Sequence, residues 1–403
     1  MNTKGRAAHK GYRAYQYLVE GVDFPAIPLV PTFGRVPSQT VEVTAEQEAR
    51  VQRLLDAHLV VSLHDHPRRS PVDLTQEREY RRNGRDHTSY EGLAVSGLDV
   101  IFDGMMDGSA FITSNAGWKW DDIVYDLGMR LCDLAHQRLL VRGESLDDLR
   151  RAKAGGQIAF VAALEAATPI ENEVDRLDVL YGLGIRVCGV SYSMSNTLGG
   201  GGREHADGGL TDFGRRAVRR MNALGMAVDI AHSGDRTSLE TIEASTKPIF
   251  ITHVGARALW DTPRMKPDNV FRACAERGGV IGVEAAPMTT LTARHPAQNI
   301  EAVMEHFEYL VQLVGIDHVA FGPDTNFGDH LGHLRMDRPH IFGPEANGGR
   351  RVEPVDYVDG LENPAECFPN ITRWLVKHGY SDTDIGQVLG ANIVRVLEQA
   401  WDH

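Results

Sequence analysis

The stretch RRAVRRMNALGMAVDIAHSG (215–234) shows the unit from which most of the chain is built. Its first half has apolar residues at the spacing of an amphipathic helix. Gly225 follows, at a position where helices commonly end in the left-handed conformation. The second half is a short, largely apolar run that ends in His232. The stretch therefore predicts a helix followed by a buried strand with a polar residue at its carboxyl end.

The same plan recurs along the chain. It is legible at 50–66, 176–193, 239–256, 269–286 and 302–324, and the run IAFVAALEAA (158–167) supplies another strand. Alternating helices and buried strands are typical of βα units around a parallel sheet. Between seven and nine parallel strands are expected, arranged as either a (β/α)8 barrel or a doubly wound sheet.

Polar residues at the strand ends favour the barrel, because barrel enzymes gather their catalytic groups at the carboxyl ends of several strands. A doubly wound nucleotide binder should carry a glycine fingerprint after its first strand. The glycines at 199–202 follow a middle strand and lack the Gly-Lys-Ser/Thr ending of a phosphate loop. We predict a TIM-type barrel over 46–403, with C-terminal helices and an insertion at 326–354, and an irregular N-terminal extension (1–45) packing on it.

Composition narrows the class of protein. The 403 residues are 42% hydrophobic and 24% charged, as in ordinary globular chains. A net charge of −13 argues against nucleic acid as a partner. The four scattered cysteines show no CxxC spacing and predict neither a disulfide framework nor a thiolate zinc site. With no membrane-length apolar stretch and no signal-peptide core, we expect no membrane association and a cytoplasmic location.

The stretch VVSLHDHPRR (60–69) raises the question of metal binding. Side chains alternate along a strand, so His64 and His66 point one way and Asp65 the other; Pro67 is expected to end the strand. A single strand-end histidine is more often a hydrogen-bonding residue than a ligand. Here, however, four histidines and two carboxylates end five strands: His64, His66, Glu165, His232, His253 and Asp324.

Imidazoles with carboxylates and without cysteine suit Zn²⁺ or a similar divalent ion. A catalytic zinc usually keeps three protein ligands, so six residues fit two ions that share a bridging carboxylate and a bridging hydroxide. Glu165 ends an apolar strand and is the predicted bridge; the alternative is a surface loop carboxylate. We expect two divalent ions, Zn²⁺ first, with Mn²⁺ or Co²⁺ as alternatives.

The stretch LEAATPIENEVDRLDVLYGLGIR (164–186) resembles the signature of the renal or membrane dipeptidase family, metal-dependent peptidases of the amidohydrolase superfamily. The resemblance covers about residues 55–400 and extends to segments 209–234, 248–259, 321–325 and 368–398. It implies hydrolysis of an amide bond next to a free carboxylate, most simply in a dipeptide, by a metal-activated bridging hydroxide.

The resemblance also implies roles for individual residues. His64, Glu165, His232 and His253 would be metal ligands, and His66 would remain one. Asp324 would act as general base and then general acid. Arg264, in RMKPDNV (264–270), would hold the substrate α-carboxylate; the alternative is a surface ion-pair residue.

Two departures from the family pattern bear on the substrate. The family has His-x-Asp where this chain has His64-Asp65-His66, so the site carries one less negative charge and each metal should be a stronger Lewis acid. Tyr192 stands where the family has a histidine that polarises the scissile carbonyl. A phenol can donate a hydrogen bond to the oxyanion but cannot be a cation. Tyr192 is either a substitute donor or a sign of another substrate.

Two alternative functions stay open. One is a hydrolase on the same scaffold that acts on an N-acyl amino acid, a lactam or lactone, or a small xenobiotic amide; the other is a catalytically silent binding protein. The 326–354 insertion is expected to form a lid or a subunit contact, and we expect a homo-oligomer. The histidines of this insertion, His330, His333 and His340, are either solvated or extra metal ligands. Met105 and Met106 should pack in a core or a pocket wall.

Overall fold

The structure is a computed structural model that describes residues 14–85, 88–105, 118–337 and 355–402. Every strand pairing in it is parallel, in the order β10-β1-β2-β4-β5-β6-β7-β8-β9, and β3 pairs with β4 beside this path. The strands are β1 (Val61–Arg69), β2 (Val100–Met105), β3 (Leu140–Arg142), β4 (Ile158–Leu164), β5 (Ile185–Gly189), β6 (Ala227–Asp229), β7 (Phe250–Val254), β8 (Val280–Val283), β9 (Val319–Phe321) and β10 (Asn326–Phe327).

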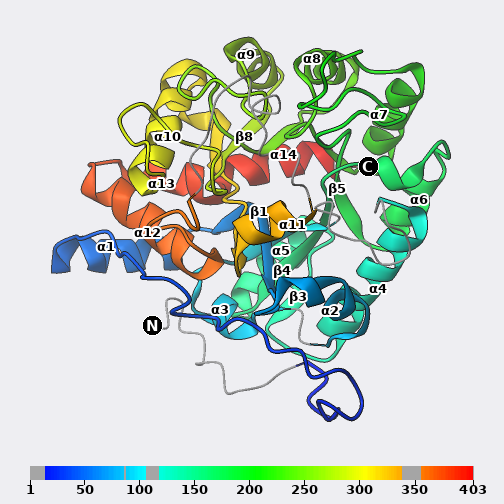
Figure 1. Ribbon diagram of the computed structural model, residues 1–403. Coiled ribbons are helices and arrows are strands. Elements are labelled where there is room, and N and C mark those ends of the chain that lie inside the picture. Colours follow the sequence, from blue (N-terminus) through cyan, green and yellow to red (C-terminus); the bar gives the residue numbers. More distant parts are fainter. Residues whose placement is uncertain (1–13, 86–87, 106–117, 338–354, 403) are drawn as a thin grey trace.

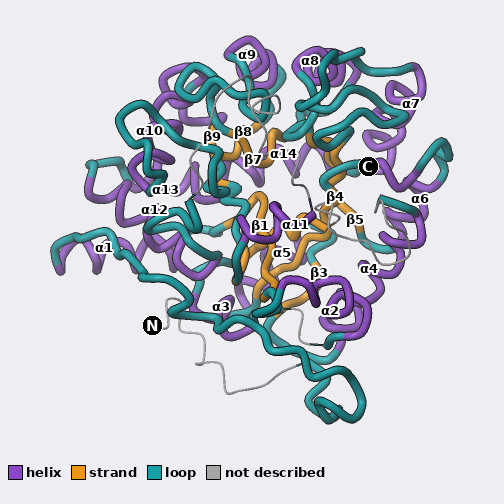
Figure 2. Tube along the Cα trace, viewed as in Figure 1, coloured by secondary structure: helices purple, strands orange, loops and turns teal. Residues whose placement is uncertain are grey.

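The two ends of the sheet meet and close a barrel. The chain runs from β9 directly into β10, which pairs with β1 at His66 and Asn326. The backbone N–H of Asp324 donates to the carbonyl of His64 at 3.0 Å, and that of His66 donates to Thr325 at 2.8 Å. With β9 and β10 counted as one interrupted strand, eight described strands form the ring in Figure 2. The predicted (β/α)8-type barrel is confirmed.

Helices surround the ring (Figure 1). They are α1 (Ala45–Ala57), α2 (Glu77–Asn83), α3 (Tyr90–Val95), α4 (Trp120–Ala135), α5 (Leu146–Ala154), α6 (Arg176–Gly182), α7 (Asp212–Leu224), α8 (Asp235–Ala244), α9 (Asp268–Glu276), α10 (Ile300–Val314), α11 (His330–Asp337), α12 (Pro364–Lys377), α13 (Asp382–Gly386) and α14 (Asn392–Ala400), with a π-helical turn at Gln387–Ala391 between the last two.

The 215–234 stretch folds as its pattern predicts. The hydroxyl of Thr211 caps α7 by accepting a hydrogen bond from Gly214 N at 2.9 Å. Gly225 ends the helix with a left-handed φ of 71°. One face of α7, including Val218 and Met221, is fully buried, and β6 follows at once. In the remaining units the helices likewise turn one apolar face toward the sheet.

The barrel interior decides which end is available for chemistry. Side chains from the strands, such as Leu63, Phe102 and Phe250, form a fully buried cluster that also contains Ile393 and Val396 of α14. Because Val61 and Ile393 share this cluster, α14 packs against the amino ends of the strands. The carboxyl ends remain for polar residues, as is usual in such barrels.

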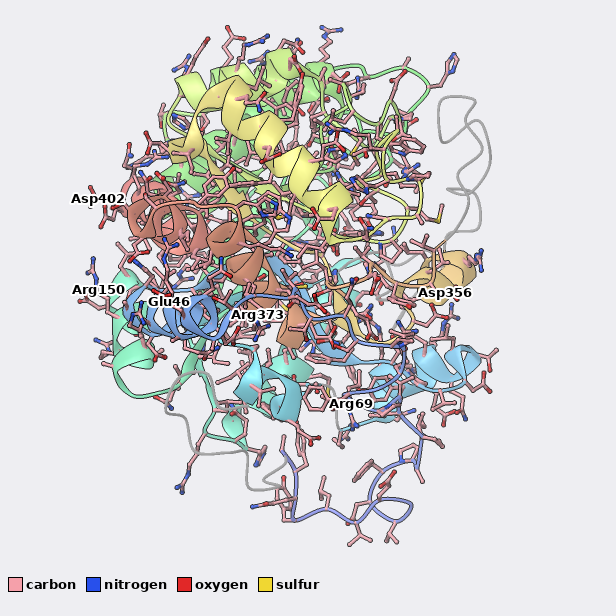
Figure 3. All side chains as sticks on the ribbon, turned by 90° about the vertical axis from the view of Figure 1, so that its left-hand side faces the viewer. Glu46, Arg69, Arg150, Asp356, Arg373 and Asp402 are labelled. Atoms are coloured by element: carbon pink, nitrogen blue, oxygen red, sulfur yellow. The ribbon has the colours of Figure 1, made fainter. Side chains whose placement is uncertain are left out.

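Segments far apart in sequence hold the outside together. Arg373 of α12 lies beside α1 (Figure 3), where its Nε donates to Glu48 Oε2 at 2.8 Å. In the N-terminal segment, Val30 N donates to Ser70 O at 2.9 Å, next to an antiparallel bridge between Leu29 and Pro71.

The prediction that Pro67 ends the first strand is wrong. β1 continues through Pro67 to Arg69, which pairs with Phe327 of β10. The register shifts between His66 and Arg69, so the missing N–H of Pro67 interrupts no ladder bond, and its carbonyl accepts from Ser89 N at 2.8 Å. Proline is tolerated in strands at such irregularities.

Met106, His340 and most of the predicted 326–354 insertion fall outside the described residues. The described start of that range holds β10, which belongs to the barrel, and then α11. Met105 is buried, as expected. Across the part of the chain that the structure describes, no helix combines the length and apolarity needed to cross a bilayer.

Candidate active site

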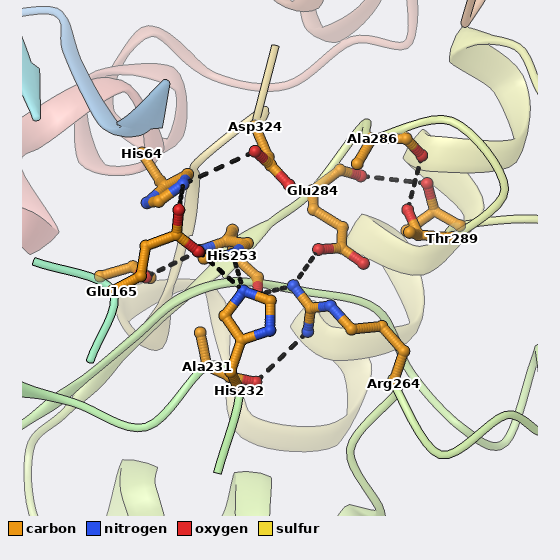
Figure 4. Close-up of polar contacts among 12 residues, drawn as sticks. His64, Glu165, Ala231, His232, His253, Arg264, Glu284, Ala286, Thr289 and Asp324 are labelled. Carbon is orange, nitrogen blue, oxygen red and sulfur yellow. Dashed lines mark hydrogen bonds and ion pairs between the residues drawn. The ribbon is translucent and has the colours of Figure 1, made fainter. Parts of the chain in front are cut away.

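The five predicted metal ligands and the predicted proton-transfer residue Asp324 meet at the carboxyl end of the barrel, and Figure 4 labels all of them except His66. Five strands supply them: β1 carries two histidines, β7 carries one, Glu165 directly follows β4, and the other two lie in the loops just after β6 and β9. All six are buried or nearly so: His64, His66, Glu165, His232, His253 and Asp324. Closure of the barrel brings together positions up to 260 residues apart in the sequence, since residues at the ends of all strands face one mouth.

Glu165 lies between two pairs of histidines. Its Oε1 is 3.8 Å from both His64 Nε2 and His66 Nε2. Its Oε2 is 3.0 Å from His232 Nε2 and 3.9 Å from His253 Nε2. The two oxygens of one carboxylate therefore face two different imidazole pairs, and the first pair lies on β1 while the second comes from β6 and β7.

Asp324 completes the side of the first pair. Its Oδ1 is 3.0 Å from His66 Nε2 and 3.6 Å from His64 Nε2. The residue has a left-handed backbone, with φ of 58°, which Asp adopts more readily than most residues. Asp65, on the opposite face of β1, accepts hydrogen bonds from the N–H of Thr325 at 2.8 Å and its hydroxyl at 2.7 Å. The middle residue of His-Asp-His therefore anchors the backbone that presents Asp324.

A hydrogen-bonded chain orients the second pair. The hydroxyl of Thr252 donates to Asp229 Oδ2 at 2.8 Å and lies 2.9 Å from His253 Nδ1. Because the hydroxyl proton goes to Asp229, His253 Nδ1 is the donor to Thr252, and Nε2 keeps its lone pair. That Nε2 lies 2.9 Å from His232 Nε2. Such outer partners are the usual means of directing imidazole ligands.

The electrostatics of the two pairs differ. Burial lowers the pKa of His64, but Asp324 and Glu165 outweigh it and raise the pKa to about 9. Burial, followed by the charge of Arg264, lowers the pKa of His232 well below its usual value. Burial and then His64 do the same for His253. The second pair is thus kept neutral, the form of imidazole that binds metal.

The donor set fits divalent cations. His64 Nε2 is buried, and its separations from Glu165 and Asp324 are too long for hydrogen bonds. Three overlapping groups of ligand atoms lie within 4.8 Å of one another: His64, His66 and Asp324; His64, Glu165 and His253; His253, Glu284 and Asp324. Imidazole nitrogens and carboxylate oxygens at such separations suit Zn²⁺ and similar ions.

Gly104 on β2 makes room for the first pair. A Cβ at this position would lie 2.3 Å from the imidazole carbon Cε1 of His64, so any other residue would displace the ring. The sequence VIFDGM (100–105) contains no sign of this requirement, because the neighbour comes from another strand.

Arg264 is buried, with 7% of its surface exposed, so the surface ion-pair alternative is wrong. Its Nη2 donates to His253 O at 2.9 Å and to the carboxylate of Glu284, and its Nη1 donates to Ala231 O at 3.3 Å. Burial raises the pKa of Glu284 to about 7, against the lowering effect of Arg264. Glu284 was not predicted as a site residue, although it follows the apolar run VIGV just as Glu165 follows its own strand.

A cavity opens above these groups, and its wall includes His66, Glu165, His232, Arg264 and Asp324. Tyr192 also lines it, half-buried, with its ring stacked on that of His232 at 3.9 Å between centroids. His330 and His333 line the same cavity, and His333 is buried with Nε2 3.3 Å from Arg68 Nη2. The expectation of solvated loop histidines is therefore wrong for His333. His330 belongs to none of the three ligand groups among the described residues.

A model of the membrane dipeptidase family, peptidase family M19, matches residues 48–333. The chain belongs to this family. The matched range contains all six residues of the barrel mouth, and the resemblance inferred from the sequence is confirmed. As a family member the chain is a metal-dependent dipeptidase-type hydrolase with a TIM-type barrel.

Individual relatives agree with this membership. The chain is 27% identical over 270 residues to an uncharacterized protein in the pqqA 5′ region of Klebsiella pneumoniae, covering 64% of this chain and 88% of that protein. It is 25% identical over 280 residues to dipeptidase tcpJ of Claviceps purpurea, covering 69% of this chain but 59% of that protein. A crystal structure of an amidohydrolase from Pseudomonas aeruginosa superimposes with a TM-score of 0.70 at 25% identity, covering 87% of this chain and 99% of that one.

Proposed function

We propose that this member of the membrane dipeptidase family hydrolyses the amide bond of a dipeptide beside its free carboxylate, with two divalent metal ions bridged by Glu165. The observation that carries the dinuclear part is the geometry of Glu165, whose Oε1 faces His64 and His66 while its Oε2 faces His232 and His253. A carboxylate so placed suits a bridging position.

The first ion would be held by His64 and His66, the second by His232 and His253. When bound, the two ions would acidify a water molecule between them, which makes a bridging hydroxide available at neutral pH, and would polarise the scissile carbonyl. We expect Zn²⁺, with Mn²⁺ or Co²⁺ as alternatives.

Asp324 is proposed to accept the proton of the attacking water and to deliver it to the leaving amine. Burial raises the pKa of Asp324, but His64 and His66 outweigh this effect and bring it well below the usual value. The carboxylate is therefore ionised and ready to act as a base. Its anchored backbone keeps Oδ1 beside His66.

The substrate would be fixed by two residues of the cavity wall. Arg264 would bind the α-carboxylate, because its permanently charged guanidinium lines the cavity. Tyr192, stacked on His232, would donate its hydroxyl proton to the developing oxyanion in place of an imidazole.

Metal analysis and a substrate panel test this function. Protein purified without chelator should contain about two ions per chain, and Zn²⁺- or Mn²⁺-loaded enzyme should hydrolyse dipeptides in a panel of both stereochemistries. Turnover of an N-acyl amino acid, lactam, lactone or xenobiotic amide with no dipeptide turned over would favour the first alternative. Less than one ion per chain together with no turnover would favour a silent binding protein.

The homo-oligomer and the cytoplasmic location stay predictions.

A further inference from the structure

The buried ion pair between Arg264 and Glu284 has no place in the mechanism above. Glu284 directly follows β8 and is fully buried, and its Oε2 accepts a hydrogen bond from Arg264 Nη2. Figure 4 shows the Glu284 carboxylate joined to the guanidinium, and a ligand atom of Glu284 also lies within 4.8 Å of those of His253 and Asp324. Arg264, in contrast, lines the cavity. Glu284 therefore lies one layer behind the cavity wall and acts on it through Arg264.

Backbone contacts hold the guanidinium in place. Nη2 donates to the carbonyl of His253, and Nη1 donates to the carbonyl of Ala231, next to His232. Together with Glu284 these contacts use both hydrogens of Nη2 and one of Nη1. A planar group fixed at both ends has little freedom to swing away from Glu284, so an incoming carboxylate meets the pair and not an isolated cation.

The charges of the pair then decide how strongly a carboxylate is attracted. An Arg–Glu pair is neutral overall, and in a buried site the field of each partner is weakly screened by solvent. A substrate carboxylate beside Arg264 is attracted by the guanidinium and repelled by Glu284 from a few ångströms further away. A substrate with an uncharged group at the same place should therefore bind almost as tightly as one with a carboxylate.

We propose that Glu284 is a positioning residue that sets substrate specificity: by pairing with Arg264 it weakens the hold on a free carboxylate and admits substrates with an uncharged group there. The inference rests on the proposed function, since it assumes that the reacting amide lies next to Arg264. The substrate class is thereby widened to dipeptides and their C-terminal amides or comparable neutral acyl amides.

The wild type offers the first test. Metal-loaded full-length enzyme at pH 8 should show kcat/KM values for a dipeptide and for its C-terminal amide within about tenfold of each other. A preference of more than about a hundredfold for the free acid would overturn the proposal, because it requires an uncompensated cation. This comparison needs no variant and is independent of any folding defect.

Glu284→Gln is the second test. It keeps the shape and the acceptor but removes the negative charge, so Arg264 should attract a carboxylate more strongly. The ratio of kcat/KM for acid over amide should rise about tenfold or more, through KM and not kcat. An unchanged ratio would overturn the proposal and would point to Arg203, the other guanidinium of the cavity wall, as the carboxylate contact.

Two controls separate charge from structure. Glu284→Asp keeps the charge and should keep the wild-type ratio; a change as large as that of Glu284→Gln would mean that side-chain fit, not charge, is responsible. Glu144→Gln removes a carboxylate from another arginine pair, in which Glu144 Oε2 lies 2.8 Å from Arg186 Nη2 near the start of β5. It should leave the ratio unchanged.

Binding separates this inference from the proposed function. Calorimetry with a phosphinic dipeptide analogue, free and C-terminally amidated, measures the acid-to-amide affinity ratio without turnover, with metal content determined for every variant. A wild type that hydrolyses no dipeptide would defeat the proposed function, and a tenfold rise of the affinity ratio in Glu284→Gln would still support the inference. Equal affinity ratios in the two proteins would overturn it.

Discussion

The two histidine pairs that flank Glu165 have the same ligand atoms in different surroundings. His64 and His66 share one strand and face Asp324 as well as Glu165. His232 and His253 come from neighbouring strands. Arg264 donates to the backbone carbonyl of His253 and to that of Ala231, the residue before His232. Two carboxylates, Glu165 and Asp324, face the first pair, whereas the second pair faces Glu165 and lies beside the guanidinium of Arg264.

This difference shows that the halves of a bridged metal site need not be equivalent. In the first half, carboxylates raise the pKa of His64 to about 9, so protons and metal compete strongly there. In the second half, burial and nearby cations keep both imidazoles neutral. We expect an acidic, proton-transferring half and a neutral, substrate-anchoring half.

The largest expected effect comes from removing the acidic character of the first half. Asp324→Asn should lower kcat by about 10²–10⁴-fold, because the amide can neither accept nor deliver the proton. The number of metal ions per chain should stay unchanged, since both histidine pairs and Glu165 remain. Steady-state kinetics with metal analysis checks this. Wild-type turnover in the variant would mean that another group moves the proton.

The effect of burial and nearby cations in the second half can be tested on a further group, Lys266. This lysine is buried beside His232, and its Nζ donates to the carbonyl of Ser233. Burial, partly opposed by Asp235, lowers its pKa from 10.5 to about 7. Between pH 10.5 and about 7 the unfolded chain binds a proton at Lys266 that the folded protein does not bind. The free energy of unfolding is therefore unaffected by Lys266 above pH 10.5 and decreases as the pH falls from 10.5 to about 7.

Lys266→Met should therefore gain stability relative to the wild type as the pH falls from about 10 to 7, by on the order of a few kcal/mol, and the gain should level off below pH 7. Thermal or urea unfolding at a series of pH values measures it. The exposed Lys377→Met is the matched control, whose difference from the wild type should not vary with pH. A constant difference for Lys266→Met as well would show that Lys266 stays charged.

The smallest effect is expected from making the first half still more acidic. His66→Asp restores the family's His-x-Asp pattern and adds negative charge to the metal ligands. The metals should become weaker Lewis acids, so kcat should fall about threefold, the acid limb of the pH–rate profile should move to higher pH, and loss of metal to chelator should slow. His330→Asp adds the same charge to the cavity wall outside the ligand groups. A similar shift there would assign the effect to the field of the cavity and not to ligation.

Much of the fold and the site could be predicted from local pattern. The helix and strand of 215–234 follow from apolar spacing and from the capping positions of Thr211 and Gly225. His64 and His66 share a face because side chains alternate along a strand, and their rings lie 5.0 Å apart. Glu165 could be predicted because a carboxylate that follows a buried apolar strand is rarely left without a charged or metal partner.

Other features depend on residues distant in sequence. Pro67 continues a strand because β10, some 260 residues later, pairs around it. Gly104 is required by the ring of His64, and Asp65 acquires its role from Thr325. Glu284 had the same local signal as Glu165, yet only the position of Arg264 shows what its carboxylate contacts.

The sequence by itself determined the repeating βα plan, the choice of imidazole and carboxylate as donors, and the family. These are local properties: apolar period, turn chemistry and the type of side chain at each strand end. The tertiary structure alone decided that one carboxylate faces two histidine pairs, that Asp324 lies beside the first pair and Arg264 beside the second, and that Arg264 is paired with Glu284. Those are properties of distances across a closed barrel, which no single segment of the chain encodes.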